Sequence, residues 1–424
     1  MQEQVIQAHR SVTVLVLGFM VFFALSSYPM MYPGYDFGLH LNTINDLSTH
    51  SNNFWHTVWA NTFAHFGIPD VASQRGLIIH RTQSFITLAL LMTSAFWFLG
   101  TALKRLDRHA QLQLAAVAVL FWLVLHGTYS SPPGERGTSH VLSWLLWYSI
   151  NYQITLPLFF FGAASLLKAV TAPSRLATLL WLALVVATAY LIARVHVAEL
   201  VYFVFIGGCI FLIYVLPGQS WRTLLIGALV VAFVVWGGQQ FSYREPLLID
   251  LMRRSSNWAE FIQFIDHYGL RMVGMNLNRS ATSWHSLYSV SLFAALLAWV
   301  FARTPAARRL AALVVLSTAL ALGIQFHYSA GLLATVMYEF VAWRFGFSTL
   351  LFLAVVLLVG MWMERRPQST SPWRTSGLLM GLPLGVLALV VLYARAFEHF
   401  SPAYQFAKSL LFSLDPVLGH YAFP

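Results

Sequence analysis

The chain has 424 residues, of which 58% are hydrophobic and only 9% are charged, with a mean hydropathy of +0.67. Soluble proteins carry about 25% charged residues, so this composition excludes an ordinary soluble protein and predicts a polytopic membrane protein. The formal net charge is +10, and the single cysteine, Cys209, excludes an internal disulfide.

Apolar runs near the length that spans a bilayer, about 20 residues, recur along the chain. The first run has only Arg10 as a basic residue before it and no A-x-A site after it, so we expect a retained span rather than a cleaved signal peptide. We expect one all-α transmembrane domain over residues 1–424. Its roughly eleven transmembrane helices are expected at 11–31, 84–103, 112–130, 146–168, 176–194, 197–216, 223–240, 286–302, 310–328, 345–363 and 376–395.

Lys and Arg residues in the short loops predict the orientation, because cytoplasmic loops are enriched in them. With the N-terminus in the cytoplasm, the inner segments hold 13 Lys and Arg and 3 acidic residues, so the entire net charge of +10 lies on that side. The opposite side holds 12 of each sign. The basic charge is therefore explained by topology, and a nucleic-acid partner is not expected.

The extracytoplasmic side carries most of the polar residues. Its two long loops are 32–83 and 241–285, and we expect short amphipathic helices in both. Shorter loops at 130–145 and 329–344 and the tail from Ala396 lie on the same side. We therefore expect the functional site there.

The first long loop opens with "PGYDFGLHLNTI", residues 33–44. Asp36, Leu39, His40 and Thr43 follow helical i, i+3, i+4, i+7 spacing and share one face. A carboxylate at a membrane surface has its pKa raised by desolvation and can act as a general base. The alternative is that Asp36 is the N-cap of a helix beginning at Phe37, with His40 as interfacial filler.

This stretch resembles the first-loop pattern of the GT-C superfamily of polytopic glycosyltransferases, in which an Asp-x-x-x-His-Leu-like sequence follows the first transmembrane helix. The resemblance covers about a dozen residues and the layout of a long first outer loop with a second large loop midway. It implies polyprenyl-phosphate-linked sugars as donors, Asp36 as the catalytic base and His40 as the residue that orients it or contacts the sugar or phosphate. The chain has no D-x-D sequence and no C-terminal soluble domain, so no cofactor is expected and a divalent metal has no motif to support it.

Three further segments supply candidate substrate-binding residues. The first, "QRGLIIHRTQ", offers arginines that can hold a lipid phosphate bidentately, or that snorkel at the interface. The second, "ARVHVAEL", places ionisable groups between two apolar runs, where they line a cavity or pair with each other. The third, "YEFVAWRFGF", resembles the GT-C pattern in which an arginine at the start of a late span holds the donor phosphate; otherwise it is an interface anchor. The candidates are Arg75, His80, Arg81, Gln83, Arg194, His196, Glu199, Glu339 and Arg344, and Glu199, Asp250 and Glu339 are the alternative bases.

Competing functions leave weaker signatures. Histidines at 40, 50, 56, 65 and 80 form no H-x-x-x-H or H-E-x-x-H motif, so we predict no metal site. A quinone or haem oxidoreductase requires paired histidines inside spans. An O-antigen ligase or polymerase shares polyprenyl substrates but has its large loop late in the chain. A lipid-linked sugar transporter or flippase is expected to place polar residues at mid-depth.

We therefore expect a glycosyltransferase of a bacterial inner membrane, with its site on the periplasmic side. It moves a sugar from a polyprenyl-phosphate donor to a glycan, lipid or pilin-like protein acceptor. Membrane lipids are its other expected partners. The sequence does not distinguish between these sugars and acceptors.

Overall fold

The computed structural model describes Val14, Gly18 and residues 35–45, 54–126, 150–195, 197–217, 256–263, 284–324 and 350–365. This part of the chain is 88% helical and contains no strands, which confirms the all-α prediction for it. The predicted spans 223–240 and 376–395 lie outside the described residues, as does 11–31 apart from its two isolated positions. The loops 130–145 and 329–344 and the tail from Ala396 also lie outside them.

By their internal contacts, the residues group into two compact units. The first comprises Met1–Ser165, Tyr190–His196 and Trp362–Pro424, and the second comprises Leu166–Ala189 and Val197–Met361. The prediction of a single transmembrane domain over 1–424 stays a prediction.

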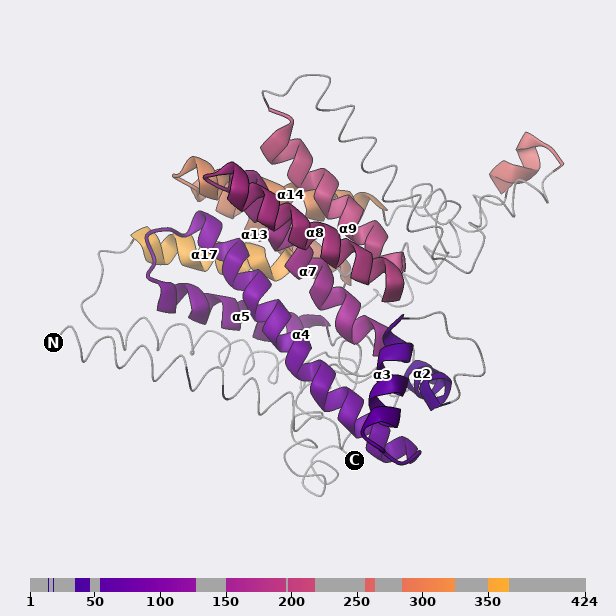
Figure 1. The fold of residues 1–424 in the computed structure, drawn as a ribbon. Coiled ribbons are helices and arrows are strands. Elements are labelled where there is room, and N and C mark those ends of the chain that lie inside the picture. The colour runs from indigo at the N-terminus through magenta and orange to yellow at the C-terminus, as the bar shows by residue number, and fades with distance from the viewer. Residues whose placement is uncertain are drawn as a thin grey trace, which may run out of the picture. The chain divides into compact units, whose positions relative to one another are not determined.

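In the first unit, two short helices precede two long ones. They are α2 (Tyr35–Asn45), α3 (Phe54–His65), α4 (Ala72–Ala102) and α5 (Arg108–His126), and α7 (Ile150–Thr171) begins in this unit. Helices α4 and α5 pack against each other as a hairpin, and α2 packs against α3 and α4 (Figure 1). Predicted spans 84–103 and 112–130 therefore correspond to two consecutive, packed helices.

In the second unit, α14 (Pro305–Ile324) contacts three other elements. These are α13 (Trp284–Phe301), α9 (Val197–Ile210) and the π-helical turn η3 (Phe211–Val215) that continues α9. The buried side of α13 carries alanines at 294, 295 and 298, and small residues let helix backbones approach closely. Helix α8 (Arg175–Val195) lies mostly in this unit, and α17 (Leu350–Arg365) divides between the two.

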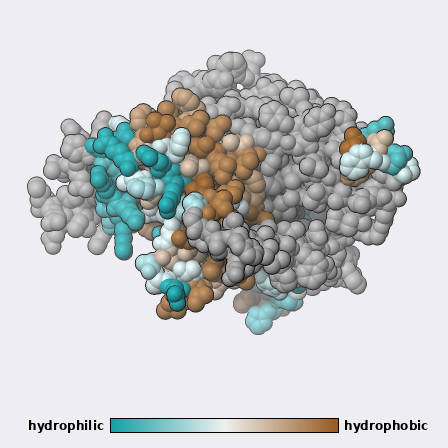
Figure 2. Space-filling model, turned by 90° about the horizontal axis from the view of Figure 1, so that it is seen from above, coloured by the Kyte–Doolittle hydropathy of each residue, from teal (hydrophilic) through white to brown (hydrophobic). Residues whose placement is uncertain are grey.

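Two of the described helices are long and apolar enough to cross a membrane: Gln74–Ala102 within α4, and Arg175–Val195. Shorter apolar helices occur at Pro157–Thr171, Phe203–Val215 and Leu292–Phe301. One side of α8 exposes large apolar side chains. Hydrophobic residues also gather in a patch on the face of the molecule that Figure 2 shows. Those exposed on α8 include Leu176, Leu179, Leu180, Val186 and Tyr190. The number of spans predicted from the sequence stays a prediction.

Helix α4 begins at Ala72, whereas the sequence placed the start of this span at residue 84. The segment "QRGLIIHRTQ" is therefore part of this helix. The reason lies in which side of the segment is buried: Gly76, Ile79, Gln83 and Thr87 are buried at intervals of three or four residues. Such intervals form one helical face.

Short connections on the predicted inner side are closed by local caps. Asp107 Oδ1 accepts the Ala110 N–H at 2.9 Å, and Ser174 Oγ accepts the Ala177 N–H at 3.3 Å. Thr304 Oγ1 accepts the Ala307 N–H at 3.2 Å, and Pro305 follows it as the first helical residue. These are preferred N-cap residues and the preferred place for proline, so the helix starts follow directly from the sequence.

Within the central loop, residues 258–263 form one short helical segment. Asn257 Oδ1 accepts the Glu260 N–H at 2.9 Å, while Glu260 accepts hydrogen bonds from the Ser256 backbone N–H and hydroxyl. These two bonds lower the pKa of Glu260. Trp258 and Ile262 are exposed one turn apart, and the amphipathic helices expected in this loop stay a prediction.

Candidate functional site

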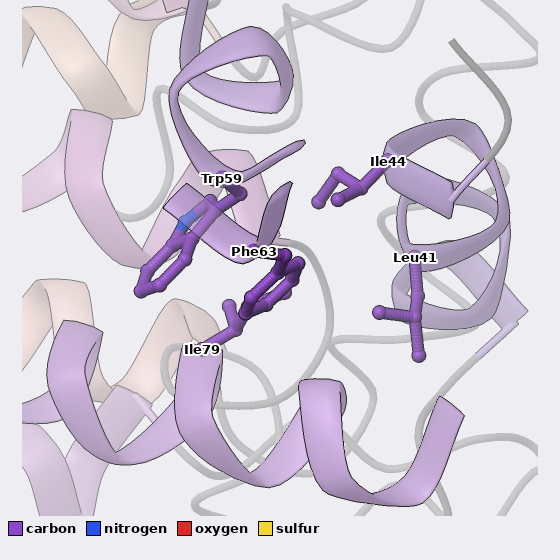
Figure 3. Packing of buried hydrophobic residues seen from close by; sticks show 5 residues of the cluster. All are labelled: Leu41, Ile44, Trp59, Phe63 and Ile79. Carbon is purple, nitrogen blue, oxygen red and sulfur yellow. The ribbon is translucent and has the colours of Figure 1, made fainter. Parts of the chain in front are cut away.

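Helices α2, α3 and the part of α4 up to Gln83, with the loop 66–71, form one packed group, which we call the α2–α4 assembly. Its core contains Leu41 and Ile44 from α2, Trp59 and Phe63 from α3, and Ile79 from α4 (Figure 3). All five are at most 5% exposed. Burial of each such side chain contributes about 1.5–3 kcal/mol relative to exposure, so this core fixes α2 against α3 and α4.

The loop between α3 and α4 has a defined backbone geometry. Gly67 has φ +59°, the Gly67 N–H donates to the Ala64 carbonyl at 3.2 Å, and the Ile68 N–H donates to the Phe63 carbonyl at 2.9 Å. These bonds form a Schellman motif, which terminates α3. Ile68 packs against the assembly core, which supplies the hydrophobic contact that accompanies this motif.

Arg75 joins the loop, α2 and α4. Its guanidinium binds four oxygen atoms: Asn45 Oδ1 at 2.7 Å, the Ile68 carbonyl at 2.9 Å, the Pro69 carbonyl at 3.1 Å and Asp70 Oδ1 at 3.2 Å. The guanidinium carbon also lies 5.0 Å from the centroid of the Phe63 ring, within cation–π range. Arg75 was predicted to bind a lipid phosphate; its side chain is only 13% exposed, and these contacts make it a structural link within the assembly.

A histidine pair lies in the same assembly. His40 Nδ1 and His56 Nε2 are 2.8 Å apart, and the ring centroids are 4.9 Å apart. His56 is 4% exposed, and together with Trp59 and Phe63 it forms the buried row of α3. The helices therefore bring together two histidines that are 16 positions apart in the sequence.

Burial determines the protonation of His56. It lowers the pKa of His56 from 6.5 to about 4, because a charged imidazolium loses its hydration in this environment. At neutral pH, His56 is therefore an uncharged ring with one N–H donor and one acceptor nitrogen.

The position of Asp36 within α2 is defined by the backbone. Helix α2 begins at Tyr35, so Asp36 lies inside the first turn rather than at the N-cap of a helix starting at Phe37. It precedes His40 by one helical turn, in the same row of the helix, as its i, i+4 spacing predicts. The side chain of Asp36 is outside what the structure describes, so its role as a base stays a prediction.

The other predicted residues of the first loop lie on α4 in different environments. Arg81 is exposed, whereas Gln83 is 0% exposed. His80 belongs to the helix, with a side chain outside the described part. Arg75 is largely buried, whereas the side chain of Arg81 is exposed. We therefore retain Arg81 as the phosphate contact.

The remaining predicted residues are not brought to the assembly by any described contact. Arg194 lies half-buried in the last turn of α8, and Glu199 lies in α9, with its side chain outside the described part. His196, Glu339 and Arg344 lie outside the described residues. Their proposed roles stay predictions.

No group of three or more His, Cys, Asp or Glu side chains suited to a metal occurs among the described residues. His40 and His56 instead lie at hydrogen-bonding distance from each other. Tertiary packing holds the His40 ring against His56. His40 lies one helical turn after Asp36 and can present an N–H or a lone pair, depending on its tautomer.

His56 is the residue that sequence reasoning did not select. A signal was present: His56, Trp59 and Phe63 follow i, i+3, i+7 spacing, which indicates a buried helical face that includes the histidine. The contact of this face with α2, however, depends on tertiary packing and has no local signature.

No protein-family model, no curated protein and no solved structure matches the chain.

Proposed function

We propose that the chain is an integral membrane glycosyltransferase that resembles the GT-C superfamily. It transfers a sugar from a polyprenyl-phosphate donor to an extracytoplasmic glycan, lipid or protein acceptor. The site lies at the α2–α4 assembly, which faces the periplasmic side of an inner membrane. The fold comprises about eleven transmembrane helices.

The observation that carries this proposal is the arrangement on α2. Asp36 and His40 occupy one row of a helix that is fixed by a hydrophobic core, and the His40 ring is engaged by His56 at 2.8 Å. A base and its orienting partner on a rigid element are the requirement for general-base catalysis. The assembly also adjoins a helix of membrane-spanning length, so a lipid-linked donor and a water-borne acceptor meet there.

In the proposed reaction, Asp36 takes the proton from an acceptor hydroxyl. The acceptor oxygen forms a bond to the anomeric carbon as the bond from that carbon to the phosphate oxygen breaks. The electron pair leaves with polyprenyl phosphate, a stable anion. His40 orients the carboxylate, and Arg81 neutralises charge on the departing phosphate.

The deciding experiment uses the purified chain in nanodiscs with a panel of polyprenyl-phosphate sugars and acceptors. We expect release of polyprenyl phosphate together with a glycosylated acceptor for at least one pair. The panel covers pentose and hexose donors, because the sugar is unknown. Intact donor throughout the panel, with donor moved across sealed vesicles, would overturn the proposal and favour a flippase.

The orientation is tested separately by single-cysteine labelling. The native Cys209 is buried and is replaced by alanine to remove background. Cysteines introduced at Ser51 and Ser256 should react with an impermeant maleimide in intact cells, whereas one at Ser369 should react only after permeabilisation. Labelling of the Ser369 variant from outside would reverse the predicted sidedness.

A further inference from the structure

The contact between His40 and His56 constrains where their protons lie. Neutral imidazole carries one N–H, on either Nδ1 or Nε2. His40 Nδ1 faces His56 Nε2 at 2.8 Å, and only one of these two nitrogens can carry the proton between them. The bond therefore links the tautomer of His40 to that of His56.

The two arrangements present different groups at the site. When His56 Nε2–H donates, His40 accepts on Nδ1 and carries its own proton on Nε2, the nitrogen farther from the backbone. When His40 Nδ1–H donates, His40 presents a lone pair at Nε2. An N–H at Nε2 stabilises a nearby carboxylate, and a lone pair repels it.

We propose that His56 is a positioning residue, which donates its Nε2–H to His40 Nδ1 and thereby holds the His40 proton on Nε2. This inference rests on the proposed function, in which an N–H of His40 orients the carboxylate of Asp36, one turn earlier in α2. His56 acts through His40 and contacts neither the sugar donor nor the molecule that accepts the sugar.

The surroundings of His56 suit this role. Its ring lies in the buried row of α3 with Trp59 and Phe63, 4% exposed, so packing fixes its orientation. Burial lowers the pKa of His56 to about 4, so the ring stays neutral and keeps a single N–H at neutral pH. A fixed neutral ring is the kind of partner that selects one tautomer of a functional histidine.

The first test reads the tautomers directly, without any turnover. The full chain, which has 15 histidines, is prepared with ring-15N histidine in nanodiscs, and the His40 and His56 signals are assigned by their loss in single variants. We expect both rings neutral, with protons on Nε2. A His40 proton on Nδ1, or a His40 imidazolium, would overturn the proposal.

The second test compares replacements of His56. Glutamine places an amide N–H near the original Nε2, whereas leucine fills volume without a donor. His56→Gln should keep the His40 proton on Nε2, and His56→Leu should lose this preference. His65→Gln is the matched control, because His65 lies exposed on the same helix, and it should leave the His40 signal unchanged.

Kinetics with the donor and acceptor that prove active give the third readout. Partners that orient metal-ligating histidines contribute about 10–100-fold to metal affinity or activity, and we expect an effect of the same order for a partner that orients His40. We expect His56→Leu to lower kcat by that factor with little change in donor KM, and His56→Gln to restore most of it. Equal kcat in wild type, His56→Gln and His56→Leu would overturn the positioning role.

The two proposals fail in different ways. If no donor is turned over but the tautomers are as expected, the glycosyltransferase proposal fails while the His56–His40 arrangement stands. If transfer occurs but His40 carries its proton on Nδ1, the glycosyltransferase proposal stands and the positioning role of His56 fails.

Discussion

The α2–α4 assembly and the short helix connections use their polar side chains in different ways. At the connections before α5, α8 and α14, the caps Asp107, Ser174 and Thr304 bind backbone groups three residues away. In the assembly, Arg75 reaches Asn45 over 30 positions and His40 reaches His56 over 16. The connections thus end helices locally, whereas the assembly is held by contacts that exist only in the folded chain.

This difference decides where function is expected. A cap satisfies a backbone group at a helix end, through a contact that the local sequence alone sets up. A polar group fixed by tertiary contacts can be directed at a substrate while its supports hold the geometry.

Asp36→Asn removes the proposed base while keeping its size. General bases contribute about 10²–10⁴-fold, so transfer should fall by at least about 10²-fold. Asp36 lies in the first turn of α2, where a negative charge contributes only about 0.3–1 kcal/mol, so the unfolding temperature should change little. Asp70→Asn, which alters an exposed carboxylate of the same assembly, is the control for activity. Near wild-type transfer by Asp36→Asn would move the search to Glu199, Asp250 and Glu339.

Acidification should destabilise the assembly through His56. Its pKa is 6.5 in the unfolded chain and about 4 in the folded protein, so the unfolded state binds the proton more readily. The stability that this group contributes is complete above about pH 6.5 and is lost as the pH falls toward 4, by up to about 3 kcal/mol. The unfolding free energies of the wild type and of His56→Gln, measured between pH 7 and 4, give this contribution by their difference. The same pH dependence in both proteins would remove His56 as the cause.

Arg75→Ala tests the long-range link of the assembly. It removes three hydrogen bonds, two of them to backbone carbonyls of the loop, and the ion pair with Asp70. Hydrogen bonds to charged groups contribute about 1.5–3 kcal/mol, so we expect a loss of about 2–3 kcal/mol in unfolding free energy and faster amide exchange in loop 66–71.

Arg81→Ala is the matched control on the same helix. Arg81 is exposed, so its removal should change stability by less than about 0.5 kcal/mol. It should instead raise the donor KM, as expected for a phosphate contact. The reverse pattern, with Arg81 essential for stability and Arg75 for donor binding, would contradict the assignment of the two arginines.

Gly67→Ala tests the backbone of the loop alone. A Cβ at Gly67 meets no atom within 4 Å, so the effect comes only from φ +59°. A left-handed conformation costs an L-residue about 1–2 kcal/mol, and thermal unfolding should show a loss of that order. Gly208→Ala is the comparison, because Gly208 has the same open space without a positive φ and should not be destabilised. Equal effects of the two substitutions would argue against the Schellman motif.

Thr304→Ala tests the other half of the comparison and should have the smallest effect. Loss of a cap costs about 0.5–2 kcal/mol, and we expect the lower end because the 3.2 Å bond is long. Transfer should be unchanged, since this cap supports a helix start only. Thr304→Ser should behave as wild type in unfolding; loss of transfer in Thr304→Ala would show that the connections do more than end helices.

The sequence predicted the parts of the fold that depend on local pattern. Apolar runs separated by short basic turns predicted the helices α4, α5, α13 and α14, and Asp107, Ser174 and Thr304 are recognisable as caps. The extension of α4 back to Ala72 was missed because its buried face includes Gly76 and Gln83, which carry no apolar signal.

For the candidate site, the sequence predicted the shared row of Asp36 and His40 but not the partners that fix it. His56 and Arg75 act through packing between helices, which depends on where the chain returns after each turn. Arg75 was predicted as a phosphate contact from its place beside a predicted span, whereas its bonds to the loop carbonyls and its ion pair with Asp70 had no local signature in the sequence.

The length of α4 has a consequence for the height of the site above the bilayer. Its 31 residues rise about 46 Å, whereas the hydrocarbon core is about 30 Å thick. In the proposed orientation, α4 therefore extends as one continuous helix from the cytoplasmic turn into the headgroup region. Helices α2 and α3 pack near its outer end. The height of Asp36 above the bilayer centre is then set by the rise and tilt of α4 rather than by a flexible loop. A thicker or thinner bilayer should therefore shift Asp36 relative to the plane of the lipid phosphates.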